Sequence, residues 1–147
     1  MTDGGGTPKR DTGSQTAIPL PLSDPDTAFF WEATARGVLR ILRCDACATF
    51  IHYPKPACRA CGATTLTPTP VSGRGHVYSY TVTHTPVRGY DAPFAVVLVE
   101  LEEQLGLRMV SQLVDVDPDD VHIGMRVEVV FHQITDDVTL PLFKVRA

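Results

Sequence analysis

The sequence is short of several features that would narrow its class. It has no cysteine beyond the four between residues 44 and 61, and no apolar run long enough to span a bilayer as a helix. Its first ten residues, MTDGGGTPKR, lack the charged-then-apolar layout of a secretory signal. These absences argue against a disulfide-stapled secreted domain and against a membrane-spanning helical protein. We expect a cytoplasmic protein.

Recognisable catalytic motifs are also missing. There is no Ser/His/acid set at a known spacing, no phosphate-cradling glycine loop at a helix start, and no HExxH motif. The segment 72–75 (SGRG) contains two glycines but precedes a predicted strand, so we interpret it as a turn. We therefore expect no catalytic residue in this chain. An independent esterase or thioesterase is a hypothesis without a nucleophile motif behind it.

The four cysteines form two CxxC pairs separated by ten residues: Cys44, Cys47, Cys58 and Cys61. Each pair places two thiolates on one tight turn, and two such turns supply tetrahedral ligands for one Zn²⁺. A closed four-thiolate site has no open coordination position, so the spacing predicts a structural zinc ribbon. Iron, as in rubredoxin, is the alternative that spacing alone leaves open. A thioredoxin-like motif would use a single pair, and His52 is surplus to the site and is interpreted as a packing or surface residue.

Charge is distributed unevenly along the chain. Residues 33–62 carry five basic side chains against Asp45, a balance of +4, whereas residues 99–137 carry ten acids against Arg108 and Arg126, a balance of −8. The sequence thus predicts a basic ribbon attached to an acidic body, a polarity that could orient an anionic ligand or a partner.

A helix is predicted from about Pro25 to Ala35, with Ser23 or Asp24 as its cap and Gly37 ending it. Three adjacent aromatics, Phe29, Phe30 and Trp31, cannot share one face of this helix. We expect Phe30 and Thr34 to be buried together, which leaves Phe29 or Trp31 to contact something else. That neighbour is either the ribbon and body of this chain or another protein.

Five strands are predicted after the cysteines, over residues 76–84, 94–101, 107–114, 125–131 and 139–146. In the first, Tyr78 and Tyr80 alternate with small polar residues and are interpreted as core aromatics, while Pro141 in the last suggests an edge or a bulge. The fold class is mainly β: an N-terminal helix and a four-cysteine zinc ribbon followed by a five-stranded OB-fold barrel, with an SH3-like barrel as the competitor. The expected divisions are a disordered tail and linker (1–22), the helix (23–38), the ribbon (39–70) and the barrel (71–147).

Both modules recur in nucleic-acid proteins, so binding of nucleic acid is one hypothesis. Tyr78 and Tyr80 could stack on bases. The excess of acids along the barrel would repel a phosphate backbone, which makes this the less favoured alternative.

Taken from about Phe29 to Phe143, the chain resembles a known family, on pieces whose order and spacing are specific. These pieces are FFWEATARG, the LRILRC that leads into the first cysteine pair, PKP before the second, SGRGHVYSYTV, APF, VEL, and the late GMRV followed by Phe131. The family combines a zinc ribbon with an OB-fold and accompanies thiolase-like enzymes that act on acyl-CoA. Two departures are Ala48 after Cys47, where glycine is common, and the long turn 102–106.

The resemblance implies an accessory subunit that binds a thiolase-like or lipid-transfer-protein-like partner in a hetero-oligomer and helps to hold an acyl-CoA. The implied reaction is a retro-aldolase (lyase) step on steroid side-chain CoA thioesters, with chemistry on the partner. The alternative is a partner of acetoacetyl-CoA thiolase and hydroxymethylglutaryl-CoA synthase. Candidate substrate or partner residues are the turn arginine, three side chains of the long loop 84–93, and the helix aromatics: Arg74, His84, Arg88, Tyr90, Phe29, Phe30 and Trp31.

Overall fold

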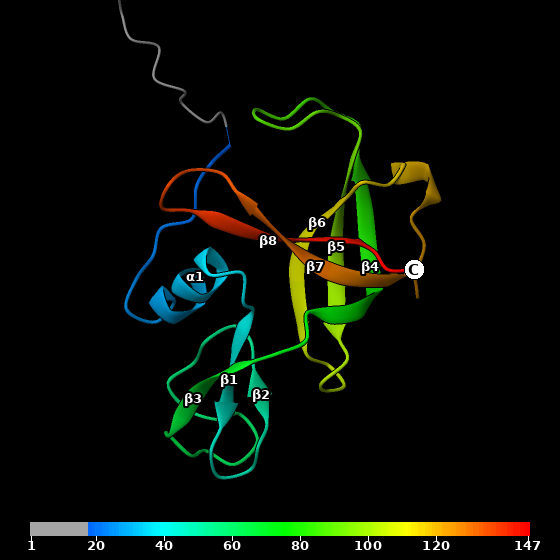
Figure 1. The fold of residues 1–147 in the computed structure, drawn as a ribbon. Helices are drawn as coiled ribbons and strands as arrows, with labels where there is room; N and C mark the ends of the chain where they lie inside the picture. The colour runs from blue at the N-terminus through cyan, green and yellow to red at the C-terminus, as the bar shows by residue number, and fades with distance from the viewer. Residues whose placement is uncertain (1–17) are drawn as a thin grey trace, which may run out of the picture.

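A computed structural model describes residues 18–147, so most of the predicted tail lies outside the described residues. The chain order is one helix, three short strands and then five longer strands (Figure 1). Strands β1 (Arg40–Cys44), β2 (Phe50–Ile51) and β3 (Leu66–Pro70) form an antiparallel sheet in the order β2-β1-β3. Within the described residues, no helix is long and apolar enough to cross a membrane.

The second unit is a closed five-stranded barrel, as predicted for an OB-fold. Its strands run in the order β4-β5-β6-β8-β7, and β6 pairs with β8 in parallel while all other pairs are antiparallel. A 3₁₀ turn, η1 (Pro118–Asp120), lies between β6 and β7. The strand bounds are β4 (Arg74–Thr83), β5 (Phe94–Leu101), β6 (Arg108–Val114), β7 (Arg126–Gln133) and β8 (Thr139–Val145).

The helix α1 (Ala28–Ala35) begins three residues later than predicted. The Asp24 carboxylate accepts hydrogen bonds from the N–H groups of Asp26 and Thr27, both at 2.9 Å, and holds a separate turn before the helix. The helix ends as predicted at Gly37, whose φ of +72° is readily available only to glycine. Phe30 and Thr34 are buried, as expected from their spacing.

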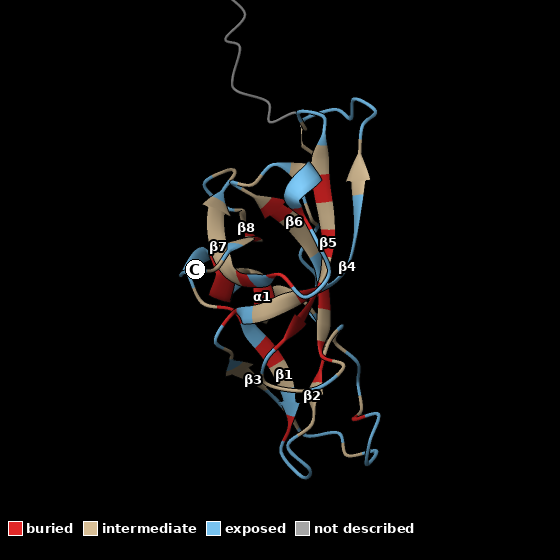
Figure 2. Cartoon of the chain, turned by 90° about the vertical axis from the view of Figure 1, so that its right-hand side faces the viewer, coloured by how far each residue is buried: buried red, intermediate tan, exposed pale blue. Residues whose placement is uncertain are grey.

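One hydrophobic core joins the helix, the start of the ribbon and the barrel. Phe30, Leu39 and Ile41 belong to the same buried cluster as the barrel residues, among which Val77 and Phe143 are fully buried. Figure 2 shows buried and half-buried positions alternating along β5, the pattern of a strand with one face inward. Because this core is continuous, the predicted divisions at 38/39 and 70/71 stay predictions.

The interpretation of Tyr78 and Tyr80 as core aromatics is wrong. Their exposed fractions are 43% and 40%, and the guanidinium of Arg108 lies 3.5 Å from the centre of the Tyr78 ring. Val77 is fully buried, so strand alternation points Tyr78 to the outer face of β4, next to an irregularity in the ladder between Val77 and Ser79. Tyr80 follows on the part of β4 that extends past its pairing with β7.

The segment 72–75 is only partly the turn that was predicted. Gly73 has the positive φ of a turn, but Arg74 and Gly75 already belong to β4. A Cβ atom at Gly75 would collide with the backbone carbonyl of Glu100 on β5. Glycine is thus required there for close strand pairing.

Candidate metal centre and apolar cavity

Two nearly identical turns bring the four cysteines together. In the first, Cys44 donates its N–H to the carbonyl of Thr49 and accepts from the N–H of Ala48. Cys58 repeats this pattern with Ala63 and Gly62. The two turns therefore present their sulfurs in equivalent ways, although Ala48 must adopt a φ of +63° to do so.

The sulfur positions fit one metal ion. All four Sγ atoms lie within 4.8 Å of one another, and the pairs Cys44–Cys61 and Cys47–Cys58 are 3.6 Å apart. A tetrahedron with metal–sulfur bonds of 2.3 Å has sulfur–sulfur edges of about 3.8 Å. The four cysteines are thus positioned to bind a metal, with Cys44 and Cys58 buried and Cys47 and Cys61 exposed.

The pKa values of two of the thiols differ widely, and a bound cation would stabilise all four thiolates. Hydrogen bonds from the hydroxyl and the N–H of Thr49 lower the pKa of Cys47 to about 6. The backbone N–H of Ala63 favours the Cys61 thiolate, but the neighbouring sulfurs of Cys44 and Cys47 outweigh it and raise the pKa of Cys61 to about 12. Four adjacent thiolates repel one another, and a divalent cation removes that penalty.

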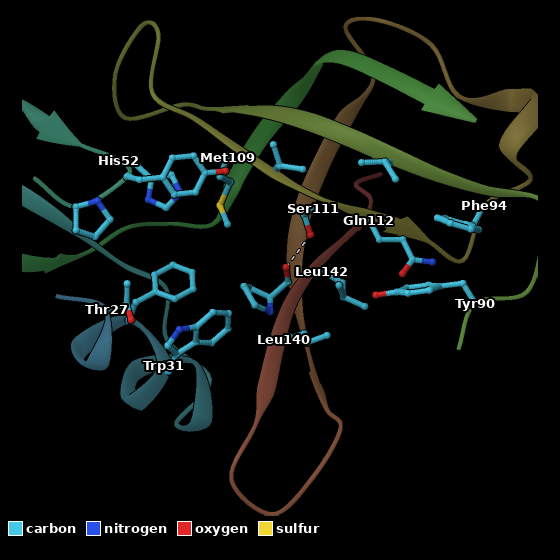
Figure 3. A pocket seen from close by; sticks show the side chains of 16 residues that line it. Thr27, Trp31, His52, Tyr90, Phe94, Met109, Ser111, Gln112, Leu140 and Leu142 are labelled. Atoms are coloured by element: carbon cyan, nitrogen blue, oxygen red, sulfur yellow. Dashed lines mark hydrogen bonds between the residues drawn. The ribbon is translucent and has the colours of Figure 1, made fainter. Parts of the chain in front are cut away.

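A cavity of about 370 Å³ lies between α1 and the barrel (Figure 3). Its lining comes from α1, the segment after β2, the β4–β5 loop, and strands β5, β6 and β8. The lining residues are Thr27, Phe30, Trp31, His52, Tyr53, Pro54, Tyr90, Phe94, Val96, Met109, Val110, Ser111, Gln112, Leu140, Pro141 and Leu142.

The cavity exists because two barrel strands separate. β6 and β8 pair only at Leu113↔Phe143 and Val114↔Lys144. Beyond that pair, the Ser111 hydroxyl donates to the carbonyl of Pro141 at 2.7 Å, the hydrogen bond drawn in Figure 3. Pro141 has no N–H to extend a ladder toward β6, although it pairs with Phe131 of β7 on its other side. The predicted edge or bulge thus corresponds only to the side of β8 that faces β6, because the barrel is closed.

The cavity has two different ends. At the end next to α1 and the ribbon, His52 stacks between Phe30 and Tyr53, with ring centroids 6.0 and 4.1 Å away. Burial lowers the pKa of His52 to about 4, so the ring is neutral near pH 7. At the other end, Tyr90 stacks on Phe94 at 5.0 Å (Figure 3).

The structure brings together three of the seven candidate substrate or partner residues: Phe30, Trp31 and Tyr90 all line the cavity. Phe29 instead borders a smaller hollow beside Arg36 and Arg40.

The remaining three candidates lie apart from the cavity. His84 and Arg88 are exposed in the loop. Arg74 forms an ion pair with Glu102 at 2.8 Å, at the opposite end of β4 and roughly 30 Å from the loop. The functional roles of all seven stay predictions.

Sequence reasoning missed the part of the lining that β6 and β8 provide. None of Met109, Gln112, Leu140 and Leu142 was singled out from the sequence. Pro141 was the single local signal, because it marks where β8 lacks a partner strand.

Ribbon and barrel together define the class of protein: a four-cysteine zinc ribbon joined to an OB-fold. Residues 31–67 match the family model described as "ChsH2, rubredoxin-like zinc ribbon domain", and residues 68–132 match "ChsH2, C-terminal OB-fold domain". A "DUF35 domain-containing scaffold protein" of Methanocaldococcus jannaschii is 39% identical over 102 residues, which are 65% of this chain and 69% of that protein. The chain belongs to this ChsH2-type DUF35 family.

Two further relatives are an enzyme subunit and a chain of a solved complex. The "3-oxo-4,17-pregnadiene-20-carboxyl-CoA hydratase alpha subunit" of Mycobacterium tuberculosis is 40% identical over 121 residues, 82% of this chain and 38% of that protein. The chain thus spans about two fifths of the length of such hydratase subunits. A solved chain of the "Ltp2-ChsH2(DUF35) aldolase" is 40% identical with a TM-score of 0.79, covering 85% of this chain and 98% of that one.

Proposed function

We propose that this chain is an accessory subunit of an acyl-CoA-processing complex, where it binds a thiolase-like partner and helps to form the acyl-CoA site. The observation that carries the proposal is the similarity to the solved aldolase chain, which this protein covers over 98% of its length. The lack of a catalytic motif in the sequence supports a division in which the partner supplies the reacting groups. The complex is a hetero-oligomer in the cytoplasm.

The proposed reaction is retro-aldol cleavage of a steroid side-chain CoA thioester. The aldolase name of the solved relative and the steroid carboxyl-CoA name of the hydratase subunit support this choice. The alternative is a partner of acetoacetyl-CoA thiolase and hydroxymethylglutaryl-CoA synthase. The relatives named as scaffold proteins support a role in holding a partner, whichever enzyme it is.

The metal in the proposed complex is Zn²⁺, held by Cys44, Cys47, Cys58 and Cys61 in a structural role. Four thiolates with no other donor favour zinc or iron, and a closed set leaves no position for substrate. The ribbon is therefore a scaffold for the neighbouring cavity and not a centre of chemistry.

Co-expression with a thiolase homologue encoded nearby tests the proposal. We expect the two chains to elute together in size exclusion with light scattering, and we expect cleavage of a steroid side-chain CoA thioester only when both are present. The controls are each chain alone. A stable monomer that changes neither the solubility nor the activity of the partner would contradict the proposal.

Nucleic-acid binding is the second candidate because Tyr78 and Tyr80 are exposed on the barrel surface. Arg108 covers the Tyr78 ring, and Arg108 is itself paired with Glu100 at 2.8 Å, which leaves little positive charge for phosphate. Retention on single-stranded DNA or RNA that weakens with salt would support this candidate. No retention at low salt would remove it.

A further inference from the structure

We propose that the cavity between α1, β6 and β8 binds the apolar body of the acyl group, a rigid fused-ring hydrocarbon, while the coenzyme A nucleotide stays outside. This inference rests on the proposed function and deepens it. It assigns the recognition of the acyl group to this chain, where the proposed function says only that the chain helps to form the site.

The size and shape of the cavity fit such a body. Its volume of about 370 Å³ lies in the range of small-molecule sites, roughly 300–1,000 Å³. It extends along the gap between β6 and β8, from Trp31 and His52 at one end to Tyr90 at the other (Figure 3). The volume equals that of about a dozen waters, whose release from apolar walls favours an apolar ligand.

Charge decides which part of a CoA thioester the cavity accepts. Among residues 18–147, no lysine, arginine, aspartate or glutamate lines it. The imidazole of His52, at the helix end, is held neutral because burial lowers its pKa to about 4. A phosphate placed there would lose its hydration without gaining a counter-charge, which costs far more than burial of a hydrocarbon.

A few neutral polar groups mark where the ligand's oxygen atoms would lie. Gln112 and Tyr90 sit at the end remote from α1, and Thr27 sits at the helix end (Figure 3). Figure 3 draws no hydrogen bond to the side chains of Gln112 and Tyr90, whereas the Thr27 hydroxyl donates to the Asp24 carboxylate at 3.0 Å and accepts from the Asp24 N–H at 3.2 Å. Neutral donors and acceptors of this kind suit keto or hydroxyl oxygens on an otherwise apolar skeleton.

Two other occupants of the cavity have to be compared with a small ligand: the N-terminal segment of this chain and a side chain of the partner. Residues 1–17 contain almost no apolar side chains, so this segment of the chain does not match the walls. An apolar side chain of the partner subunit would match them. The test therefore separates a small ligand from a partner side chain.

Trp31 provides the measurement because it is the only tryptophan of the chain and lines the cavity. We expect an uncharged four-ring keto-steroid to change its fluorescence saturably. The CoA thioester of a steroid acid should do the same, and coenzyme A alone should leave the emission unchanged at a concentration about tenfold higher.

A matched pair of valines supplies the variants. Val110 lines the cavity and Val145 does not, and both are strand residues that are about half exposed, 55% and 40%. Val110→Glu should weaken keto-steroid binding at least about tenfold, whereas Val145→Glu should change it less than about twofold. Should Val110→Glu fail to fold, Val96→Phe narrows the cavity with an apolar ring and should give the same loss.

Capture of the thiolase-like partner is measured on the same variants. Partner capture without any Trp31 response in the wild-type chain overturns the cavity assignment and leaves the proposed function standing. A Trp31 response without partner capture supports the cavity assignment and contradicts the proposed function. No Trp31 response, together with loss of partner capture in Val110→Glu, shows that the cavity seats a partner side chain and overturns this inference.

Discussion

His52 illustrates how one residue connects the ribbon to the rest of the molecule. It follows β2 directly, and its ring stacks on Phe30 from α1 and on Tyr53. The sequence left a packing and a surface position open for His52, and the ring packs against both aromatic neighbours. Its surroundings favour the neutral ring, because a buried imidazolium would have no counter-charge among the residues that line the cavity.

This burial predicts a pH dependence of stability. The pKa of His52 is about 4 in the folded chain and 6.5 ordinarily, so the unfolded chain takes up the proton first as the pH falls. The contribution of the neutral ring to the free energy of unfolding is complete above pH 6.5 and is lost as the pH falls from 6.5 to about 4. The loss amounts to at most about 3 kcal/mol.

His52→Phe keeps an aromatic ring at this place but cannot titrate. Urea denaturation between pH 4 and 7 should show a flatter stability profile for this variant than for the wild type. His122→Gln, at an exposed histidine, is the control and should leave the profile unchanged. An unchanged slope in His52→Phe would contradict the prediction.

Among the elements, the barrel strands were predictable and the ribbon sheet was not. The predicted strand Phe94–Leu101 matches β5 at both ends. A continuous run of apolar and β-branched residues between two turns is typical of a buried strand. β1, β2 and β3 were not predicted as strands, since short strands beside metal-binding turns carry no clear periodicity.

The remaining differences have tertiary causes. The bulge at Tyr78 follows from the pairing of β4 with β5, and no local pattern reports it. The cavity depends on where β6 and β8 part, which is a property of barrel closure. Family resemblance, rather than periodicity, linked the chain to acyl-CoA complexes.

Removal of one metal ligand should loosen the ribbon selectively. Cys58→Ser should lose the bound zinc and increase hydrogen exchange over residues 40–65, because Cys44, Ile51 and Cys58 form a small core of their own. The barrel strands should remain protected. Metal analysis and hydrogen exchange with mass spectrometry provide the measurement.

Ala46→Ser is the matched control, since it adds the same hydroxyl to an exposed position of the first turn. It should retain one zinc per chain. Full zinc content and unchanged exchange in Cys58→Ser would show that the four-thiolate assignment is wrong.

At the scale of the whole molecule, the ribbon and the barrel are joined by more than the chain connection. The side chain of Gln104, in the turn between β5 and β6, accepts from the N–H of Phe50 at 2.8 Å and donates to its carbonyl at 3.1 Å. This pair of hydrogen bonds fixes β2 against the barrel. The turn 102–106, noted in the sequence as unusually long for the family, thus has a structural role.

Gln104→Ala should separate the two units partially. Two partly buried backbone groups of Phe50 lose their partners, at a cost of about 1–3 kcal/mol. Thermal unfolding and the exchange rate of the Phe50 amide are the measurements. Leu105→Ala, at a neighbouring side chain that is 88% exposed, should leave both unchanged.

The uneven anchoring of β4 has a consequence for how a ligand reaches the cavity. In the ladder, β4 pairs with β7 only through Arg74, Gly75 and His76, and the rest of the strand is held by β5 alone. β5, by contrast, is paired with β6 from Ala95 to Glu100, so the part that extends beyond both ladders is the loop 84–93, which carries Tyr90. We therefore expect movement of this loop relative to the barrel to change the width of the cavity at its Tyr90 end, while the paired strands stay in place.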